Sequence, residues 1–128
     1  MALPPMHIAV LDDDLSVRTA ISRVLRASGI EAACYSSSME LLSAVSRKVP
    51  DCVVLDLQMP GMTGTDVLHY FAHAGVRVPV IVITAHDEVG SPEACIAAGA
   101  AAYLRKPLDA DELIRAINKA VKTSQTAG

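Results

Sequence analysis

The chain has 128 residues and a mass of 13.5 kDa, a size that suits one domain and is too small for separate catalytic and regulatory domains. Its formal net charge of −3 and its pI near 5.7 give no general attraction to phosphate backbones, so direct binding of nucleic acid by this segment is not expected. Apolar residues make up 52% of the chain but aromatic residues only 3%, which favours an aliphatic core of helices packed on a parallel sheet.

The chain shows no signal for export or membrane insertion. Its first residues lack the basic and apolar regions of a signal peptide, and no stretch approaches the roughly 20 apolar residues of a membrane span. Three widely spaced cysteines, Cys34, Cys52 and Cys95, fit neither a disulfide framework nor a zinc site. We therefore expect a cytoplasmic protein with reduced thiols.

Apolar runs of strand length alternate with helical patterns along the chain. The first half predicts a strand at 8–11, a helix from Asp14 to Gly29, a strand at 30–35, a helix from Ser37 to Pro50 and a strand at 52–56. The second half predicts a helix between Thr63 and Gly75, a strand at 79–84, a helix at 91–98, a strand at 101–104 and a last helix from Asp109. This alternation predicts an α/β fold, a doubly wound parallel sheet of five strands with five helices on its two faces.

The sequence predicts a single domain. The predicted domain spans residues 1–122, without internal repeats or low-complexity segments. Residues 123–128 are polar and lack apolar periodicity, so we expect them to form a disordered tail or the start of a linker.

Polar residues stand at the carboxyl ends of four predicted strands. Asp12 and Asp13 follow the first strand, Asp56 ends the third, Thr84 ends the fourth, and Lys106 follows the fifth. Because parallel strands end at one edge of the sheet, we expect these side chains to converge. Carboxylates about 4 to 5 Å apart would repel by several kcal/mol, so they must share a proton or hold a cation, and oxygen ligands alone favour Mg²⁺ or Mn²⁺. In such a site Asp56 can attack phosphorus, while Lys106 and Thr84 contact phosphoryl oxygens.

Each of these residues also has a simpler interpretation. The acidic triplet can be a solvated turn in which Asp14 caps the following helix, and Thr84 and Lys106 can be ordinary turn and loop residues. Their joint occurrence at the ends of four strands favours the phosphoryl-transfer site.

In this combination and order, the motifs resemble those of a receiver domain of a two-component response regulator. The matching segments, within roughly residues 7–122, are 11–14, 55–64, 83–85 and 103–107. The resemblance implies a flavodoxin-like sheet with strand order 2-1-3-4-5. It also implies a signalling domain, not a metabolic enzyme, that catalyses its own phosphorylation and slow dephosphorylation.

The resemblance also implies roles for individual residues. Asp56 would accept a phosphoryl group from the phosphohistidine of a sensor histidine kinase or of a phosphotransfer protein. Asp12 and Asp13 would hold Mg²⁺ together with Asp56 and the backbone carbonyl of Gln58. Thr84 would be the hydroxyl that moves toward the phosphoryl group.

Further positions follow from the same resemblance. Lys106 would contact the phosphoryl group and form a cis peptide bond with Pro107. Tyr103 would be the aromatic switch that turns inward on phosphorylation, although half-buried packing explains an aromatic residue there equally well. Gln58 and His86 would flank the site, and His86 can equally be a solvated loop residue.

Phosphorylation would then alter the surface formed by the fourth helix, the fifth strand and the last helix. This surface could dock a partner or a second copy of the chain; its small apolar residues include Ala94, Ile96, Ala97 and Ala98. Residues 83–87 are similar to receivers that precede a LuxR-type helix-turn-helix, so a C-terminal DNA-binding domain in a longer protein and a stand-alone receiver both remain open.

Two other functional classes fit the sequence less well. A haloacid-dehalogenase-like phosphatase needs a second acid two residues after its aspartyl nucleophile, and Gln58 stands there. An interaction module of the same fold that never accepts phosphate would not need Asp56, Thr84 and Lys106 together.

Overall fold

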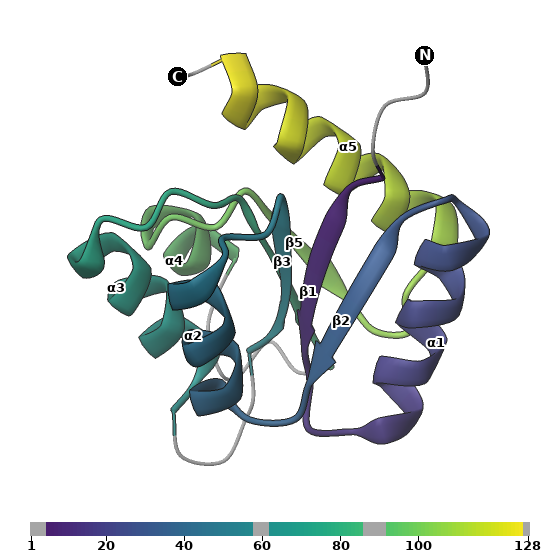
Figure 1. The fold of residues 1–128 in the computed structure, drawn as a ribbon, viewed down its shortest axis with the longest axis horizontal. Coiled ribbons are helices and arrows are strands. Elements are labelled where there is room, and N and C mark those ends of the chain that lie inside the picture. The colour runs from purple at the N-terminus through teal and green to yellow at the C-terminus, as the bar shows by residue number, and fades with distance from the viewer. Residues whose placement is uncertain (1–4, 58–61, 86–91, 127–128) are drawn as a thin grey trace.

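The strands form one parallel sheet in the order β2-β1-β3-β4-β5 (Figure 1). The structure, a computed structural model, describes residues 5–57, 62–85 and 92–126. Every neighbouring pair of strands is parallel, which confirms the predicted fold class and strand order. The strands are β1 (His7–Leu11), β2 (Glu31–Tyr35), β3 (Cys52–Asp56), β4 (Val80–Thr84) and β5 (Ala102–Arg105).

Helices cover both faces of the sheet. In Figure 1, α1 and α5 lie on one face, and α2, α3 and α4 lie on the other. The helices are α1 (Leu15–Ala27), α2 (Ser38–Arg47), α3 (Gly64–Ala74), α4 (Pro92–Ala97) and α5 (Ala110–Thr126). None of the helices in the described part of the chain combines the length and the apolar character needed to cross a membrane.

The core consists of two apolar layers separated by the sheet. Alternate residues of a strand face opposite sides, so Val53 and Leu55 of β3 pack under α2, α3 and α4, whereas Cys52 and Val54 pack under α1 and α5. The strands β3 and β4 are buried along their whole length, as the short apolar run of β3 and the continuous β-branched run of β4 predict. Asp56 is two residues after Val54 and therefore points to the same face of the sheet as Cys52 and Val54, the face covered by α1 and α5.

The predicted strands match the observed ones closely, but the last helix is longer than expected. Strand β3 has the predicted bounds, and the other four strands begin within one residue of the prediction. Residues 123–126 are helical, because α5 continues to Thr126, which differs from the expected disordered tail or linker. A helix that has formed propagates with one hydrogen bond per added residue, and no Gly or Pro interrupts this stretch before Gly128.

Helix caps fix where the chain enters several helices. Asp14 caps α1 by accepting the Ser16 N–H at 2.8 Å, as predicted. Thr63 and Asp66 form a reciprocal capping box at the start of α3. This box matters for the site, because α3 follows the loop that leaves Asp56.

Candidate functional site

The polar residues at the strand ends meet at the carboxyl edge of the sheet, the lower edge in Figure 1. Three of the four buried polar residues in the described ranges lie here: Asp12, Asp56 and Thr84, with 0%, 4% and 0% of their surface exposed. The fourth, Ser38, begins α2. Burial of two carboxylates side by side is costly unless a cation or hydrogen-bond donors compensate them.

Lys106 supplies that compensation. Its Nζ lies 2.8 Å from Asp12 Oδ2 and 3.7 Å from Asp56 Oδ2, so one ammonium group bridges the acids that follow β1 and end β3. Burial by itself would lower the pKa of Lys106, but the hydrogen bond to Asp12 and the charges of Asp12 and Asp56 outweigh it, so the pKa is raised. The lysine therefore stays charged between the two carboxylates at neutral pH.

The position of Asp12 is fixed by its neighbours. Its Oδ1 accepts the Asp14 N–H at 2.9 Å, and its carbonyl oxygen accepts a hydrogen bond from Arg18 Nη1 at 2.6 Å. The sequence alone does not predict this role of Arg18, in the first turns of α1, because nothing there distinguishes it from other basic residues. It ties α1 to the end of β1 and so holds the Asp12 backbone in place.

The end of β3 is held on two sides. The Leu57 N–H donates to Ile83 O at 2.9 Å, and the Gly64 N–H donates to Leu57 O at 3.0 Å. A Cβ added at Gly64 would lie 2.8 Å from Leu57 Cα and 3.0 Å from Asp56 O. Only glycine allows α3 to begin this close to the backbone that carries Asp56. Gly64 belongs to a motif in the sequence, but the sequence alone does not predict its close contact with Leu57 and Asp56.

Strand β5 brings the remaining candidates to the edge. The Lys106 N–H donates to Thr84 O at 2.8 Å, and the Lys106–Pro107 peptide bond is cis. Register pairs Thr84 with Arg105 and Val82 with Tyr103, so Thr84 and Tyr103 belong to the same face of the sheet. Tyr103 is partly buried against the core layer of α2, α3 and α4. Burial, followed by the charges of Cys95 and Glu93, raises the pKa of its phenol.

The acidic residues also form a possible metal site. Asp12, Asp13 and Asp56 each offer a carboxylate oxygen, and these atoms lie within 4.8 Å of one another. Asp12 and Asp56 are buried, whereas Asp13 is exposed and gives access from solvent. An all-oxygen set of this kind fits a hard divalent cation such as Mg²⁺. Gln58 and His86, the other predicted residues of the site, lie outside the described residues.

Comparison with known proteins identifies the family. A family model for the response regulator receiver domain matches residues 8–118. The chain belongs to this family. The resemblance inferred from the strand-end motifs is therefore confirmed, and the edge described above is that of a receiver domain.

Relatives of this receiver domain include longer proteins. The response regulator protein TodT of Pseudomonas putida is 36% identical over 115 residues, which cover 90% of this chain and 51% of TodT. The DNA-binding transcriptional regulator NtrC of Klebsiella pneumoniae is 34% identical over 116 residues, which cover 91% of this chain and 25% of NtrC. The chain thus spans about half the length of TodT and a quarter of that of NtrC.

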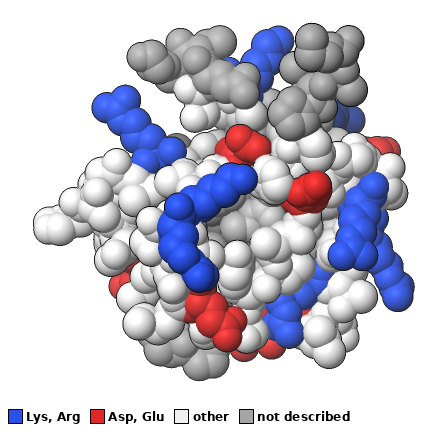
Figure 2. Space-filling view, in the orientation of Figure 1, with Lys and Arg blue, Asp and Glu red and all other residues white. Residues whose placement is uncertain are grey.

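A solved structure has the same fold over nearly the whole receiver domain. The response regulator receiver domain protein from Clostridium thermocellum superposes with a TM-score of 0.88 at 30% identity, covering 96% of this chain and 99% of that one. On the face shown in Figure 2, Lys and Arg side chains lie scattered among acidic and uncharged ones.

Proposed function

We propose that this receiver domain is a phosphorylation switch in which Asp56 accepts a phosphoryl group from the phosphohistidine of a sensor histidine kinase or of a phosphotransfer protein. The observation that carries this proposal is the buried Asp12–Lys106–Asp56 arrangement at the carboxyl edge of the sheet. A structural ion pair would need one acid. The second acid, close to the same ammonium and at the end of the central strand, is the group available for chemistry.

The proposed transfer is a direct displacement at phosphorus. A carboxylate oxygen of Asp56 forms a bond to phosphorus while the phosphorus–nitrogen bond of the donor breaks, and the imidazole leaves with the electron pair. Lys106 lies close enough to Asp56 to contact an oxygen of the phosphoryl group once it is attached. The Thr84 hydroxyl donates a hydrogen bond to another of these oxygens. Hydrolysis of the aspartyl phosphate, slowly and at the same residues, resets the switch.

Asp12, Asp13 and Asp56 would hold Mg²⁺, with Mn²⁺ as the alternative ion, and the backbone carbonyl of Gln58 would complete the protein ligands. The ion supplies positive charge that reduces the repulsion between the carboxylates and the incoming phosphoryl oxygens. Within this set, Asp12 is positioned by the Asp14 N–H, so its carboxylate is oriented before any ion binds. The exposure of Asp13 lets the ion enter from solvent.

We propose that Thr84 and Tyr103 transmit the effect of phosphorylation from Asp56 to the surface of the domain. Because these residues share a face of neighbouring strands, a movement of the Thr84 hydroxyl toward the phosphoryl group makes room for the Tyr103 ring. The resulting change would reach the surface of α4, β5 and α5, where a partner or a second copy of this chain would bind. In a longer protein we propose a C-terminal DNA-binding domain as the output, because the related NtrC is a DNA-binding transcriptional regulator. We place this reaction in the cytoplasm.

The proposal is tested by phosphorylation with acetyl phosphate and Mg²⁺, followed by intact-mass measurement. The wild type is expected to gain one phosphoryl group that is stable to acid and labile to base. Asp56→Asn is expected to gain none. Asp51→Asn is the matched control, because Asp51 precedes the same strand at its other end, and this variant is expected to be phosphorylated like the wild type.

Two outcomes would overturn the proposal. Absence of any mass gain in the wild type would favour an interaction module that never accepts phosphate. Rapid multiple turnover of generic phosphate esters would favour a hydrolase.

A further inference from the structure

We propose that His69 and His73 form a binding site for a divalent transition-metal ion on the exposed side of α3. Both histidines are exposed. The proposed ion is one that prefers nitrogen ligands, such as Ni²⁺, Zn²⁺ or Cu²⁺. The site is separate from the carboxylates of the phosphorylation site and would exist whether or not Asp56 accepts phosphate.

The helix directs both imidazoles away from the core. Phe71, midway between the two histidines, is 4% exposed and anchors α3 to the core layer. At 3.6 residues per turn, a residue two positions from Phe71 points about 200° away from it, so both histidines lie on the solvent side.

The four-residue spacing also places the histidines next to each other. They differ by about 40° around the helix axis and by about 6 Å along it, so the side chains are neighbours on one face. Two imidazoles at this spacing on a helix can bind the same ion, as in helical zinc motifs. The arrangement is a chelate: once one nitrogen has bound the ion, the second is already close to it.

Helix α3 is held in shape before any metal binds. Its first turn carries the Thr63–Asp66 capping box, and its last turn ends at Gly75 in the left-handed conformation with φ of 71°. Such preorganisation reduces the ordering that binding would otherwise require. His73 stands in the last turn, where the partial negative charge of the helix C-terminus favours a cation.

The ligand set determines the class of metal. Neutral imidazole suits Zn²⁺, Ni²⁺ and Cu²⁺, whereas Mg²⁺ prefers oxygen. Among the residues that the structure describes, the group of three or more potential ligands is the acidic one at Asp12, Asp13 and Asp56. Asp66, one turn before His69, has an oxygen engaged by the Thr63 N–H at 3.0 Å. We propose two protein ligands, one nitrogen from each histidine, with water completing the coordination.

The test is calorimetric titration of the full chain, without an affinity tag, with Ni²⁺ and separately with Zn²⁺. Excess Mg²⁺ in all samples occupies the acidic site. The wild type is expected to bind one equivalent of each ion, while His69→Ala and His73→Ala are each expected to lose about tenfold or more in affinity, because the chelate is reduced to a single imidazole.

A matched variant separates spacing from histidine content. In His73→Ala combined with Ala74→His, the chain keeps both imidazoles on α3 but places them five residues apart, about 140° around the helix axis. This double variant is expected to bind as weakly as the single variants. His7→Ala and Cys34→Ser, which remove other exposed ligands, are expected to retain wild-type affinity.

The proposal is overturned if the wild type fails to bind either ion in the presence of Mg²⁺. It is also overturned if the spacing variant or either single variant binds as tightly as the wild type. Thermal unfolding of each variant without added metal shows whether α3 remains folded, so loss of affinity cannot be mistaken for loss of structure.

Discussion

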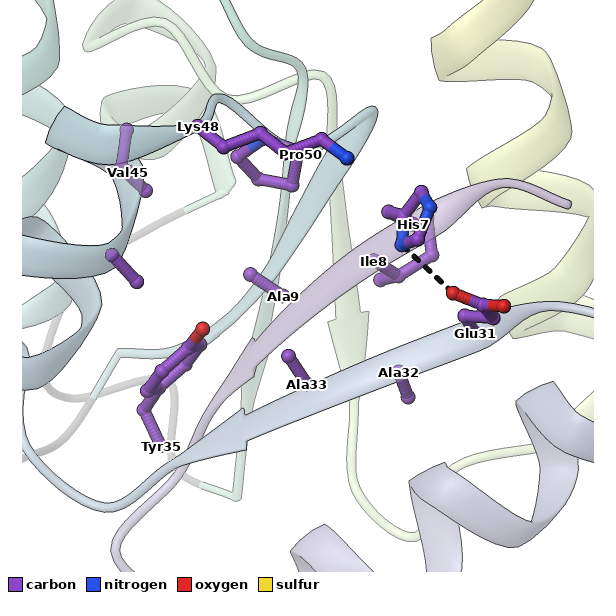
Figure 3. Close-up of a pocket in the computed structure, with 11 residues that line it drawn as sticks. His7, Ile8, Ala9, Glu31, Ala32, Ala33, Tyr35, Val45, Lys48 and Pro50 are labelled. Carbon is purple, nitrogen blue, oxygen red and sulfur yellow. Dashed lines mark ion pairs between the residues drawn. The ribbon is translucent and has the colours of Figure 1, made fainter. Parts of the chain in front are cut away.

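The two edges of the sheet carry similar charged groups in very different surroundings. At the amino edge, His7 Nδ1 lies 3.0 Å from Glu31 Oε2, and these side chains are 47% and 59% exposed (Figure 3). At the carboxyl edge, Lys106 Nζ lies 2.8 Å from Asp12 Oδ2, with side chains 19% and 0% exposed. The two contacts have nearly the same length but differ in their access to water, and the contact at the amino edge is an ion pair only when His7 is protonated.

Strand β3 shows the contrast within a few residues. Asp51, before the strand, is exposed and accepts the His7 N–H at 2.9 Å, whereas Asp56, at the end of the strand, is buried. Beside the amino edge lies a hollow of about 240 Å³ whose lining includes Ala9 and Ala33 (Figure 3). His7 and Glu31, the two residues of the exposed contact, also line this hollow. At the carboxyl edge Asp12 and Asp56 are instead buried, and this burial makes the removal of their charged partner costly.

The largest expected effect follows from removing the buried cation. Lys106→Met keeps most of the side-chain volume but leaves Asp12 and Asp56 facing each other without the ammonium group. In EDTA we expect the free energy of unfolding to fall by about 3 kcal/mol, because removing one partner of a buried ion pair leaves an uncompensated charge. Urea unfolding measures this loss.

Added Mg²⁺ sharpens the interpretation. Since the ion takes the place of the missing positive charge, saturating Mg²⁺ is expected to stabilise Lys106→Met more than it stabilises the wild type. An equal loss with and without Mg²⁺ would mean that Lys106 acts through packing and not through its charge.

The second prediction concerns the backbone of the carboxyl edge. Gly64→Ala places a Cβ 2.8 Å from Leu57 Cα, and we expect a loss of about 2 kcal/mol in stability together with a lower yield of phosphorylated Asp56. Gly75→Ala is the matched control at the other end of α3, because its φ of 71° is strained for alanine but nothing lies within 4 Å of its Cβ.

This control is expected to cost about 1 kcal/mol, through backbone strain alone, and to leave the yield of phosphorylation unchanged. Acetyl phosphate labelling of the two folded variants, scored by intact mass, distinguishes them. Equal yields would show that the close approach of α3 does not position Asp56.

The sequence predicts the carboxyl edge well because its information is local. A continuous apolar run that ends in one polar residue specifies both a buried strand and the residue at its end, and this holds for Asp56 and Thr84. Parallel topology then brings distant strand ends together. Asp12 and Lys106 could therefore be assigned to one edge from their positions after the first and fifth strands.

What the sequence could not predict depends on contacts between elements. The hydrogen bond from Arg18 to the Asp12 carbonyl and the close contact of Gly64 with Leu57 require the three-dimensional arrangement of the helices. The length of α5 was missed for another reason. Residues 123–126 carry no apolar periodicity, but a helix already anchored by its earlier turns continues through polar residues until a breaker occurs.

The third prediction concerns the burial of the Cys52 thiol, next to the amino edge of the sheet. Cys52 follows the exposed Asp51, yet burial raises the pKa of its thiol from 9.0 to about 12, with a smaller opposing effect of a hydrogen bond with the Val53 backbone. The unfolded chain loses this proton at lower pH than the folded one. Stability from this group is therefore fully present below pH 9 and is lost as the pH rises toward about 12, by about 1.4 kcal/mol between about pH 8 and pH 10.

Cys52→Ala is the comparison for this measurement. Groups such as Tyr103 and Lys106, whose pKa values are also raised, contribute equally to both proteins and cancel in the difference. The variant is expected to be less stable at about pH 8 but to lose about 1.4 kcal/mol less than the wild type by about pH 10. Parallel pH profiles of unfolding would show that water reaches the thiol in the folded protein.

The smallest effect is expected at the exposed ion pair of the amino edge. Glu31→Gln removes the charge facing His7 while keeping the shape of the side chain, and we expect the free energy of unfolding to change by less than about 1 kcal/mol. Raising the ionic strength should shrink even this difference, because salt screens exposed charges, whereas the effect of Lys106→Met should persist. If Glu31→Gln lowers the free energy of unfolding as much as Lys106→Met in the same urea titrations, burial does not explain the contrast between the two edges.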